Sequence, residues 1–145
     1  MIHPTAIIHP GAQLHESVRV GPYSVIDEHV TVGAGGELGP HVHLTGRTTI
    51  GAENRFHTGC VIGDAPQDLK YGGEPTRLII GDRNLFREHV TVHRSNTPDE
   101  DTRIGTKNFF MANSHVGHNS IIGNKVILAN GVLIAGHEMI GDGAF

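Results

Sequence analysis

The sequence has no tryptophan, only two tyrosines and a single cysteine among its 145 residues. The lone Cys60 excludes an internal disulfide framework and fits a reducing compartment, so we expect a cytoplasmic protein. No apolar stretch approaches the about 20 residues of a membrane-spanning helix, so no membrane span is expected. Basic charge is also scarce. The net charge is −4 and the twelve histidines are dispersed, which argues against nucleic-acid binding.

What the sequence does contain is a six-residue repeat in one apolar position. Neither a helix nor an ordinary strand has this period, whereas a parallel β-helix does, because each hexad supplies one short strand and a turn. The first repeating apolar residue is Ile2, so we expect no signal peptide before the repeat. The twenty-one repeating residues are Ile2, Ile8, Leu14, Val20, Ile26, Val32, Leu38, Leu44, Ile50, Phe56, Ile62, Ile80, Phe86, Val92, Ile104, Phe110, Val116, Ile122, Leu128, Ile134 and Ile140.

Two further positions of the hexad have a preferred residue type. The position four after the apolar residue is mostly small or β-branched, as in Ala12, Val30 and Ser114, and we expect it to share a narrow interior with the apolar residue. Glycine directly follows the apolar residue in ten of the twenty-one hexads, as at Gly21 and Gly117. The absence of a Cβ there is predicted to permit the turn.

The repeat resembles that of hexapeptide-repeat proteins along nearly the whole chain. The resemblance implies an all-β fold, a left-handed parallel β-helix shaped as a triangular prism, with three hexads per coil and about seven coils. We expect residues 1–145 to form a single domain of this kind. A repeat unit cannot bury its flat face alone, and the resemblance implies a homotrimer.

Two segments interrupt the repeat while preserving its phase, namely Asp68–Ile79 and Pro98–Arg103. We expect both to leave the prism as extruded loops. Loops held by a rigid scaffold commonly carry recognition residues, although such segments can equally be tolerated surface insertions. The sequence leaves open which corner of the prism carries them.

The chemistry is best sought in the turns around His118 and Gly136. Residues 18 apart should stack at the inter-strand spacing of about 4.8 Å, which puts His118 under Gly136 and Asn119 under His137. An imidazole beside a backbone without a side chain would suit acyl transfer, with His118 as general base and the Gly136 N–H as oxyanion donor. The alternative is that these are surface histidines, like many others in this chain.

Two longer stretches are similar to the UDP-N-acetylglucosamine O-acyltransferases of lipid A biosynthesis: the segments 62–94, with its loop QDLKYGGEPT, and 113–137. The resemblance implies transfer of an (R)-3-hydroxyacyl chain from acyl carrier protein to the 3-hydroxyl of the UDP-sugar, with no cofactor and no metal. It assigns His118 as the general base and the Gly136 backbone as the oxyanion stabiliser. The substrate contacts that it implies are Gln67, Asp68, Lys70, His115 and His137.

The chain departs from that family in two ways. The family commonly has aspartate where this chain has Asn119, which can orient the imidazole of His118 but supplies no charge, so Asn119→Asp is expected to speed transfer. The family also continues into a C-terminal helical domain that residues 1–145 do not include. The chain is therefore expected to be either a truncated form or a short relative.

Two alternative functions remain open. A γ-type carbonic anhydrase-like zinc enzyme would use three histidines, here His115, His118 and His137, but their spacing differs from the usual one. A catalytically silent scaffold would keep the prism and lack a complete active site.

Overall fold

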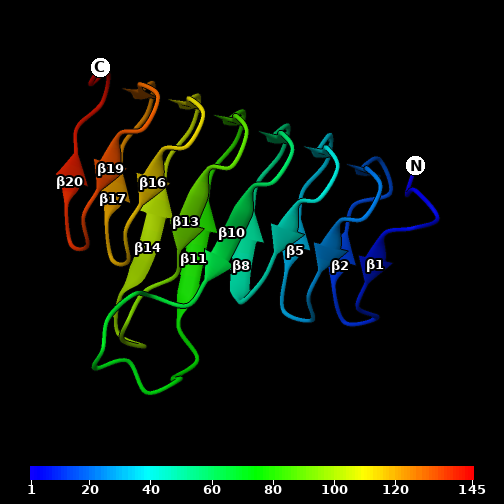
Figure 1. The fold of residues 1–145 in the computed structure, drawn as a ribbon, viewed down its shortest axis with the longest axis horizontal. Coiled ribbons are helices and arrows are strands. Elements are labelled where there is room, and N and C mark those ends of the chain that lie inside the picture. Colours follow the sequence, from blue (N-terminus) through cyan, green and yellow to red (C-terminus); the bar gives the residue numbers. More distant parts are fainter.

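A computed structural model describes residues 1–145, which form twenty strands and no helix (Figure 1). The strands belong to three parallel sheets, in which each strand pairs with the strand three places along the chain. In the first such pair, Ile7 lies beside Val25, eighteen residues later. One coil is therefore three hexads, as the resemblance to hexapeptide-repeat proteins implies. The structure contains no helix with the length and apolar character that a membrane crossing needs.

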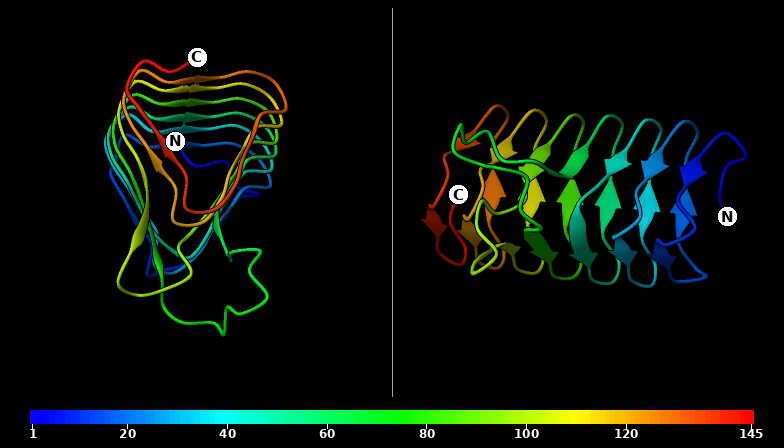
Figure 2. Two further views of the ribbon diagram at one scale, coloured as in Figure 1. Left: turned by 90° about the vertical axis from the view of Figure 1, so that its left-hand side faces the viewer. Right: turned by 90° about the horizontal axis from the view of Figure 1, so that it is seen from below.

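The three sheets are the sides of a triangular prism (Figure 2). The β1–β19 sheet contains β1 (Ile7–Ile8), β4 (Val25–Ile26), β7 (His43–Leu44), β10 (Val61–Asp64), β13 (Thr91–His93), β16 (His115–Val116) and β19 (Leu133–Ile134). The β2–β20 sheet contains β2 (Gln13–Leu14), β5 (Thr31–Val32), β8 (Arg47–Ile50), β11 (Arg77–Ile80), β14 (Asp101–Ile104), β17 (Ile121–Ile122) and β20 (Met139–Ile140). The β3–β18 sheet contains β3 (Arg19–Val20), β6 (Glu37–Leu38), β9 (Arg55–Phe56), β12 (Leu85–Phe86), β15 (Phe109–Phe110) and β18 (Ile127–Leu128).

The coil has the predicted left hand. Seen from the C-terminal end, the chain turns clockwise as it advances toward the viewer (Figure 2). This is opposite to the usual hand of connections between parallel strands.

The predicted apolar column fills the prism. Its central members are almost fully buried, and three of them, Phe56, Phe86 and Phe110, stack in consecutive coils with ring centroids 4.7 and 4.9 Å apart. These distances match the coil spacing, so each ring packs flat on the next. Toward the chain ends, Ile8 and Ile140 are only partly buried. The core is therefore densest in the middle coils.

The second inward position is polar in three consecutive coils. Asn54, Asn84 and Asn108 are buried, and the side-chain oxygen of each accepts the backbone N–H one coil further on. The Asn84 and Asn108 N–H groups donate at 2.9 Å in this ladder. Because every buried amide has partners, the ladder ties the coils together without the cost of unsatisfied polar groups.

The role predicted for the glycines that follow the apolar residue was largely wrong. Of the ten, only Gly63 has a positive φ. Most of the others are required by the close approach of stacked coils, whereas a Cβ on Gly141 would meet nothing within 4 Å. A Cβ on Gly21 would lie 2.7 Å from the backbone carbon of Gly39, and one on Gly117 2.6 Å from that of Ala135. The left-handed turn position lies two residues later and is often not glycine.

Both interruptions leave the prism at one corner, between the β1–β19 and β2–β20 sheets (Figure 2). The first loop is residues 65–76, between β10 and β11, and the second is residues 94–100, between β13 and β14. The predicted loop ends were therefore displaced, because Arg77–Ile79 and Asp101–Arg103 pair with each other in the β2–β20 sheet. These strands are longer than most since their earlier inward residues, such as Leu78, are also fully buried.

Candidate active site

The corner that carries the loops also carries the turns singled out in the sequence. His118 lies between β16 and β17, and Gly136 lies between β19 and β20, on the coils that follow the two loops. The loop residues and the turn residues thus share one edge of the prism (Figure 2).

His118 and Gly136 are in direct contact, as their 18-residue separation predicts. A Cβ built on Gly136 would lie 2.6 Å from Nε2 and 2.7 Å from Cε1 of His118. The half-buried imidazole therefore lies against the Gly136 backbone, where any other residue would displace it. The backbone N–H of Gly136 donates to no backbone or side-chain acceptor in the protein, so it is available to a ligand.

The hydrogen bonds of Asn119 identify the tautomer of the neutral His118 ring. Nδ2 of Asn119 donates to Oε2 of Glu100 at 2.8 Å, and Oδ1 accepts the backbone N–H of Asn96 at 2.9 Å. A carboxylate only accepts and a backbone N–H only donates, so both contacts orient the amide in the same way. Nδ1 of His118, 3.0 Å from Oδ1, must then carry the proton. In the neutral ring, Nε2 then has the lone pair, and this nitrogen faces Gly136.

A pocket of about 250 Å³ opens beside this pair. Its lining residues are Gln67, His93, His115, Gly117, His118, Leu133, Ile134, Ala135 and Gly136. His115 Nδ1 lies 2.6 Å from the hydroxyl of Thr91, and burial lowers the pKa of His115. Burial, and then the charge of His115, lowers the pKa of His93 to about 4. These two rings, 4.6 Å apart, are therefore neutral hydrogen-bonding groups at neutral pH.

Asp68 is held in its charged form at the base of the first loop. The backbone N–H of Lys70 donates to it at 3.0 Å and the Asn96 side chain at 2.8 Å, and these bonds, the first being the larger cause, lower its pKa. The Asn96 backbone N–H also donates to Asn119. Hydrogen bonds through Asn96 and Asn119 therefore connect Asp68 to His118. The side chain of Lys70 is exposed and forms no ion pair with the protein.

The predicted site residues do not all meet in one place. Gln67, His115, His118 and Gly136 line the pocket, and Asn119 is buried behind His118. The exposed His137 meets the His118 ring edge to face, with centroids 5.1 Å apart, and is outside the pocket lining.

Sequence reasoning missed His93, Asn96 and Glu100. His93 directly follows Val92, and Gly117 directly follows Val116, which lies beside Val92 in the next coil. The position of His93 in its hexad could therefore have indicated that it lies near the site. Asn96 and Glu100 are in a loop, where the period gives no such signal.

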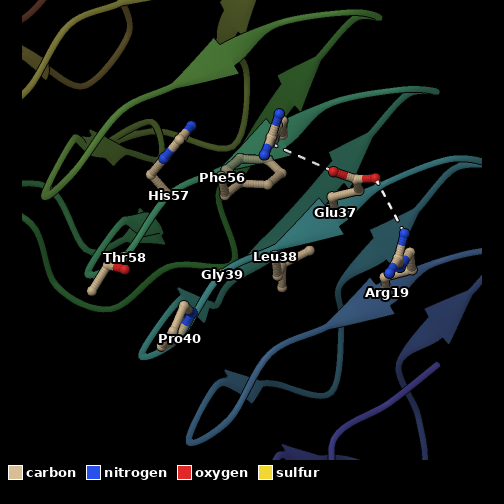
Figure 3. A pocket seen from close by; sticks show the side chains of 9 residues that line it. Arg19, Glu37, Leu38, Gly39, Pro40, Phe56, His57 and Thr58 are labelled. Atoms are coloured by element: carbon tan, nitrogen blue, oxygen red, sulfur yellow. Dashed lines mark ion pairs between the residues drawn. The ribbon is translucent and has the colours of Figure 1, made fainter.

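A larger hollow of about 560 Å³ lies on a different side of the prism (Figure 3). It is on the β3–β18 sheet, where Glu37 pairs with Arg19 at 3.9 Å and with Arg55 at 3.5 Å. These charges are exposed and satisfy one another. None of the site residues predicted from the sequence lines this hollow, so we place the site at the loop corner.

The comparisons with known proteins agree on one family. A model of the bacterial transferase hexapeptide (six repeats) matches residues 101–136. The acyl-[acyl-carrier-protein]--UDP-N-acetylglucosamine O-acyltransferase of Saccharophagus degradans is 51% identical over 121 residues, which are 83% of this chain and 47% of that protein. LpxA from Acinetobacter baumannii is 46% identical with a TM-score of 0.95, over 97% of this chain and 55% of that one. This chain belongs to the UDP-N-acetylglucosamine O-acyltransferase family.

Within the UDP-N-acetylglucosamine O-acyltransferase family, more distant members keep the same fold. The Francisella novicida enzyme is 37% identical, with a TM-score of 0.95 over 98% of this chain and 52% of that one. The predicted family resemblance and the hexapeptide β-helix are thus confirmed. The chain spans about half the length of the relatives it matches.

The zinc-enzyme alternative gains no support from the side chains. No group of three His, Cys, Asp or Glu residues is placed to hold a metal ion. Nδ1 of His115 and Nδ1 of His118 are each occupied by a side-chain oxygen, of Thr91 and Asn119 respectively.

Proposed function

We propose that this chain contains the active site of an acyltransferase that moves an (R)-3-hydroxyacyl chain from acyl carrier protein to the 3-hydroxyl of UDP-N-acetylglucosamine. The observation that carries the proposal is the contact of the His118 imidazole with Gly136. A ring nitrogen with a free lone pair lies beside a backbone N–H with no acceptor, and acyl transfer needs these two groups together.

In the proposed reaction, Nε2 of His118 accepts the proton of the sugar 3-hydroxyl. At the same time, the oxygen of that hydroxyl attacks the carbonyl carbon of the thioester. The carbonyl oxygen becomes negative, and the N–H of Gly136 donates a hydrogen bond to it, which is worth about 3 kcal/mol in comparable sites. The carbon–sulfur bond then breaks and the imidazolium returns the proton to the sulfur. The products are the ester and the free carrier thiol, and no cofactor takes part.

The substrate contacts follow from the loop and the pocket. Gln67 and His115 are placed in the lining, where neutral donors and acceptors suit a polar sugar. Asp68 is charged and fixed, and the exposed Lys70 offers a mobile cation for the diphosphate. His137, at the outer edge of His118, completes the set that we propose for substrate binding.

A direct test replaces His118 by alanine and measures transfer from a 3-hydroxyacyl carrier protein to UDP-N-acetylglucosamine. Loss of a positioned base should lower turnover by about 10²- to 10⁴-fold with the fold intact. His29→Ala is the control, because His29 is an exposed histidine whose contact is with Glu28, on the same edge of the prism but on a coil before the first loop. Parental turnover in His118→Ala would overturn the mechanism, and a folded parent with no transfer would favour the silent scaffold.

The assembly and location are part of the same proposal. We propose a homotrimer in the cytoplasm, with the flat prism faces packed together and the loop corners at the subunit boundaries. The support is the flatness of three uninterrupted sheets (Figure 2). Light scattering at micromolar concentration should give three times the chain mass, and the mass of one chain would disprove the trimer.

A further inference from the structure

Glu100 of the second loop has a contact that the mechanism above does not use. Its Oε2 accepts the 2.8 Å hydrogen bond from Nδ2 of Asn119, whose Oδ1 lies 3.0 Å from Nδ1 of His118. A carboxylate, an amide and the imidazole thus form a continuous line of hydrogen bonds, and the line ends at the nitrogen opposite to the one that faces Gly136.

Asn119, the middle member, is fixed from several sides. It is buried, its backbone N–H donates to the Thr102 hydroxyl at 2.8 Å, and its φ of 63° belongs to the turn. The Asn96 N–H occupies its Oδ1 as well. An asparagine can nevertheless turn its amide over, which would present Nδ2 to His118 and remove the acceptor for Nδ1–H. The negative charge of Glu100 opposes that reversal, because it would then face a carbonyl oxygen.

Glu100 is the only carboxylate that forms a hydrogen bond with Asn119. Asp101 is engaged by Arg77 at 2.7 Å and by Arg103 at 3.0 Å. Asp99 forms no hydrogen bond or ion pair within the protein. Other charged or titratable groups near the ring are Asp68 in the first loop, His115, and His137, whose Nδ1 lies 4.0 Å from Glu100.

We propose that Glu100 is a positioning residue for His118, acting through Asn119. It keeps the His118 proton on Nδ1 and supplies, one side chain further away, the negative charge that stabilises the imidazolium formed in the reaction. The inference rests on the proposed acyl transfer for its effect on rate, whereas its effect on the ring can be observed without any substrate.

The structure also changes what Asn119→Asp should do. An aspartate at this position would place a carboxylate oxygen at hydrogen-bond distance from Oε2 of Glu100, where Nδ2 is now. Two adjacent carboxylates repel, so either the exposed Glu100 side chain turns into solvent or one of the two takes up a proton, and the single substitution gains little. The gain expected from the sequence should emerge only when Glu100 is neutralised at the same time.

The experiment compares Glu100→Ala, Glu100→Gln and Asp99→Asn with the parent chain. Nitrogen NMR of the imidazole, at neutral pH and without substrate, reports which nitrogen of His118 carries the proton. We expect only the Nδ1–H form in the parent and in Asp99→Asn, and a mixture of both forms in Glu100→Ala. Turnover should fall about tenfold in Glu100→Ala with a smaller change in KM, in keeping with loss of a charge-assisted hydrogen bond. Glu100→Gln keeps an acceptor and should lie in between.

Rescue separates positioning from a general effect of the loop. Asn119→Asp should restore turnover when combined with Glu100→Gln, because the new carboxylate accepts directly from Nδ1–H. The proposal is overturned if Glu100→Ala leaves both the ring protons and turnover unchanged, or if Asp99→Asn has the same effect. If the ring protons respond as expected while the parent transfers no acyl group, the positioning role stands and the proposed reaction fails.

Discussion

The contact between His118 and Gly136 makes Gly136→Ala the most informative single substitution. The new methyl carbon would lie 2.6 Å from Nε2, 2.7 Å from Cε1 and 3.1 Å from Cδ2 of the ring. All three contacts are with a side chain and none is with backbone, and the φ of Gly136 is not in the left-handed region. The imidazole can therefore swing away, and the fold should lose about 1 kcal/mol or less.

The chemical effect should be much larger than the structural one. Displacing the ring removes the base from its place, and the methyl group crowds the approach to the backbone N–H. Either loss alone is typically worth about 10²-fold or more, so we expect turnover to fall by about 10²- to 10³-fold. The assay is acyl transfer at saturating substrates, accompanied by a urea unfolding curve.

Gly11→Ala is the matched control for this substitution. Its methyl carbon would lie 2.9 Å from Cγ of Glu28, again a flexible side chain, and 3.3 Å from the Glu28 backbone oxygen, on a coil far from the pocket. It should leave turnover unchanged. Parental turnover in Gly136→Ala, with the same unfolding curve, would refute the placement of the reacting groups.

Three further outcomes are expected. Phe86→Ala removes the middle ring of the stack and should lower the free energy of unfolding by about 3–5 kcal/mol in urea titrations, with Phe86→Leu costing less. Burial lowers the pKa of His93 from 6.5 to about 4, so the unfolded chain binds the proton first. The free energy of unfolding should therefore rise with pH across that window, and His93→Gln should flatten the rise. Lys70→Ala should raise KM for the UDP-sugar and leave turnover at saturation little changed; the reverse would put Lys70 in the chemical step.

The fold was predictable because the repeat constrains every hexad in the same way. Apolar residues such as Ile26 and Phe86 mark the inward column, and the resemblance to hexapeptide-repeat proteins adds the coil of three strands. The reason for the glycines was not predictable, since the sequence does not distinguish a positive φ at Gly63 from a close backbone approach at Gly21. Nor could the loop ends be located, because Leu78 is an inward residue outside the main column.

The candidate site was predictable only where stacking by eighteen applies. That rule brings His118 and Gly136 together, and the family resemblance adds Gln67 and His115. The stacking rule does not place Glu100, because the position of a loop residue depends on how the loop folds over the corner. The hydrogen bond to Asn119 therefore becomes visible only in three dimensions.

The coil of three hexads also determines which lengths of chain can be gained or lost. Removal of eighteen residues from the coils that precede the first loop would delete one coil of the prism. His118 would still lie against Gly136 at the loop corner. Removal of six residues would preserve the alternation of inward and outward side chains while turning everything downstream by a third of a turn. The upper coils would remain a regular prism, yet their strands would stack on the wrong sheets below. Whole coils, rather than hexads, are therefore the units by which such a chain can shorten or lengthen while each sheet stays continuous along the prism.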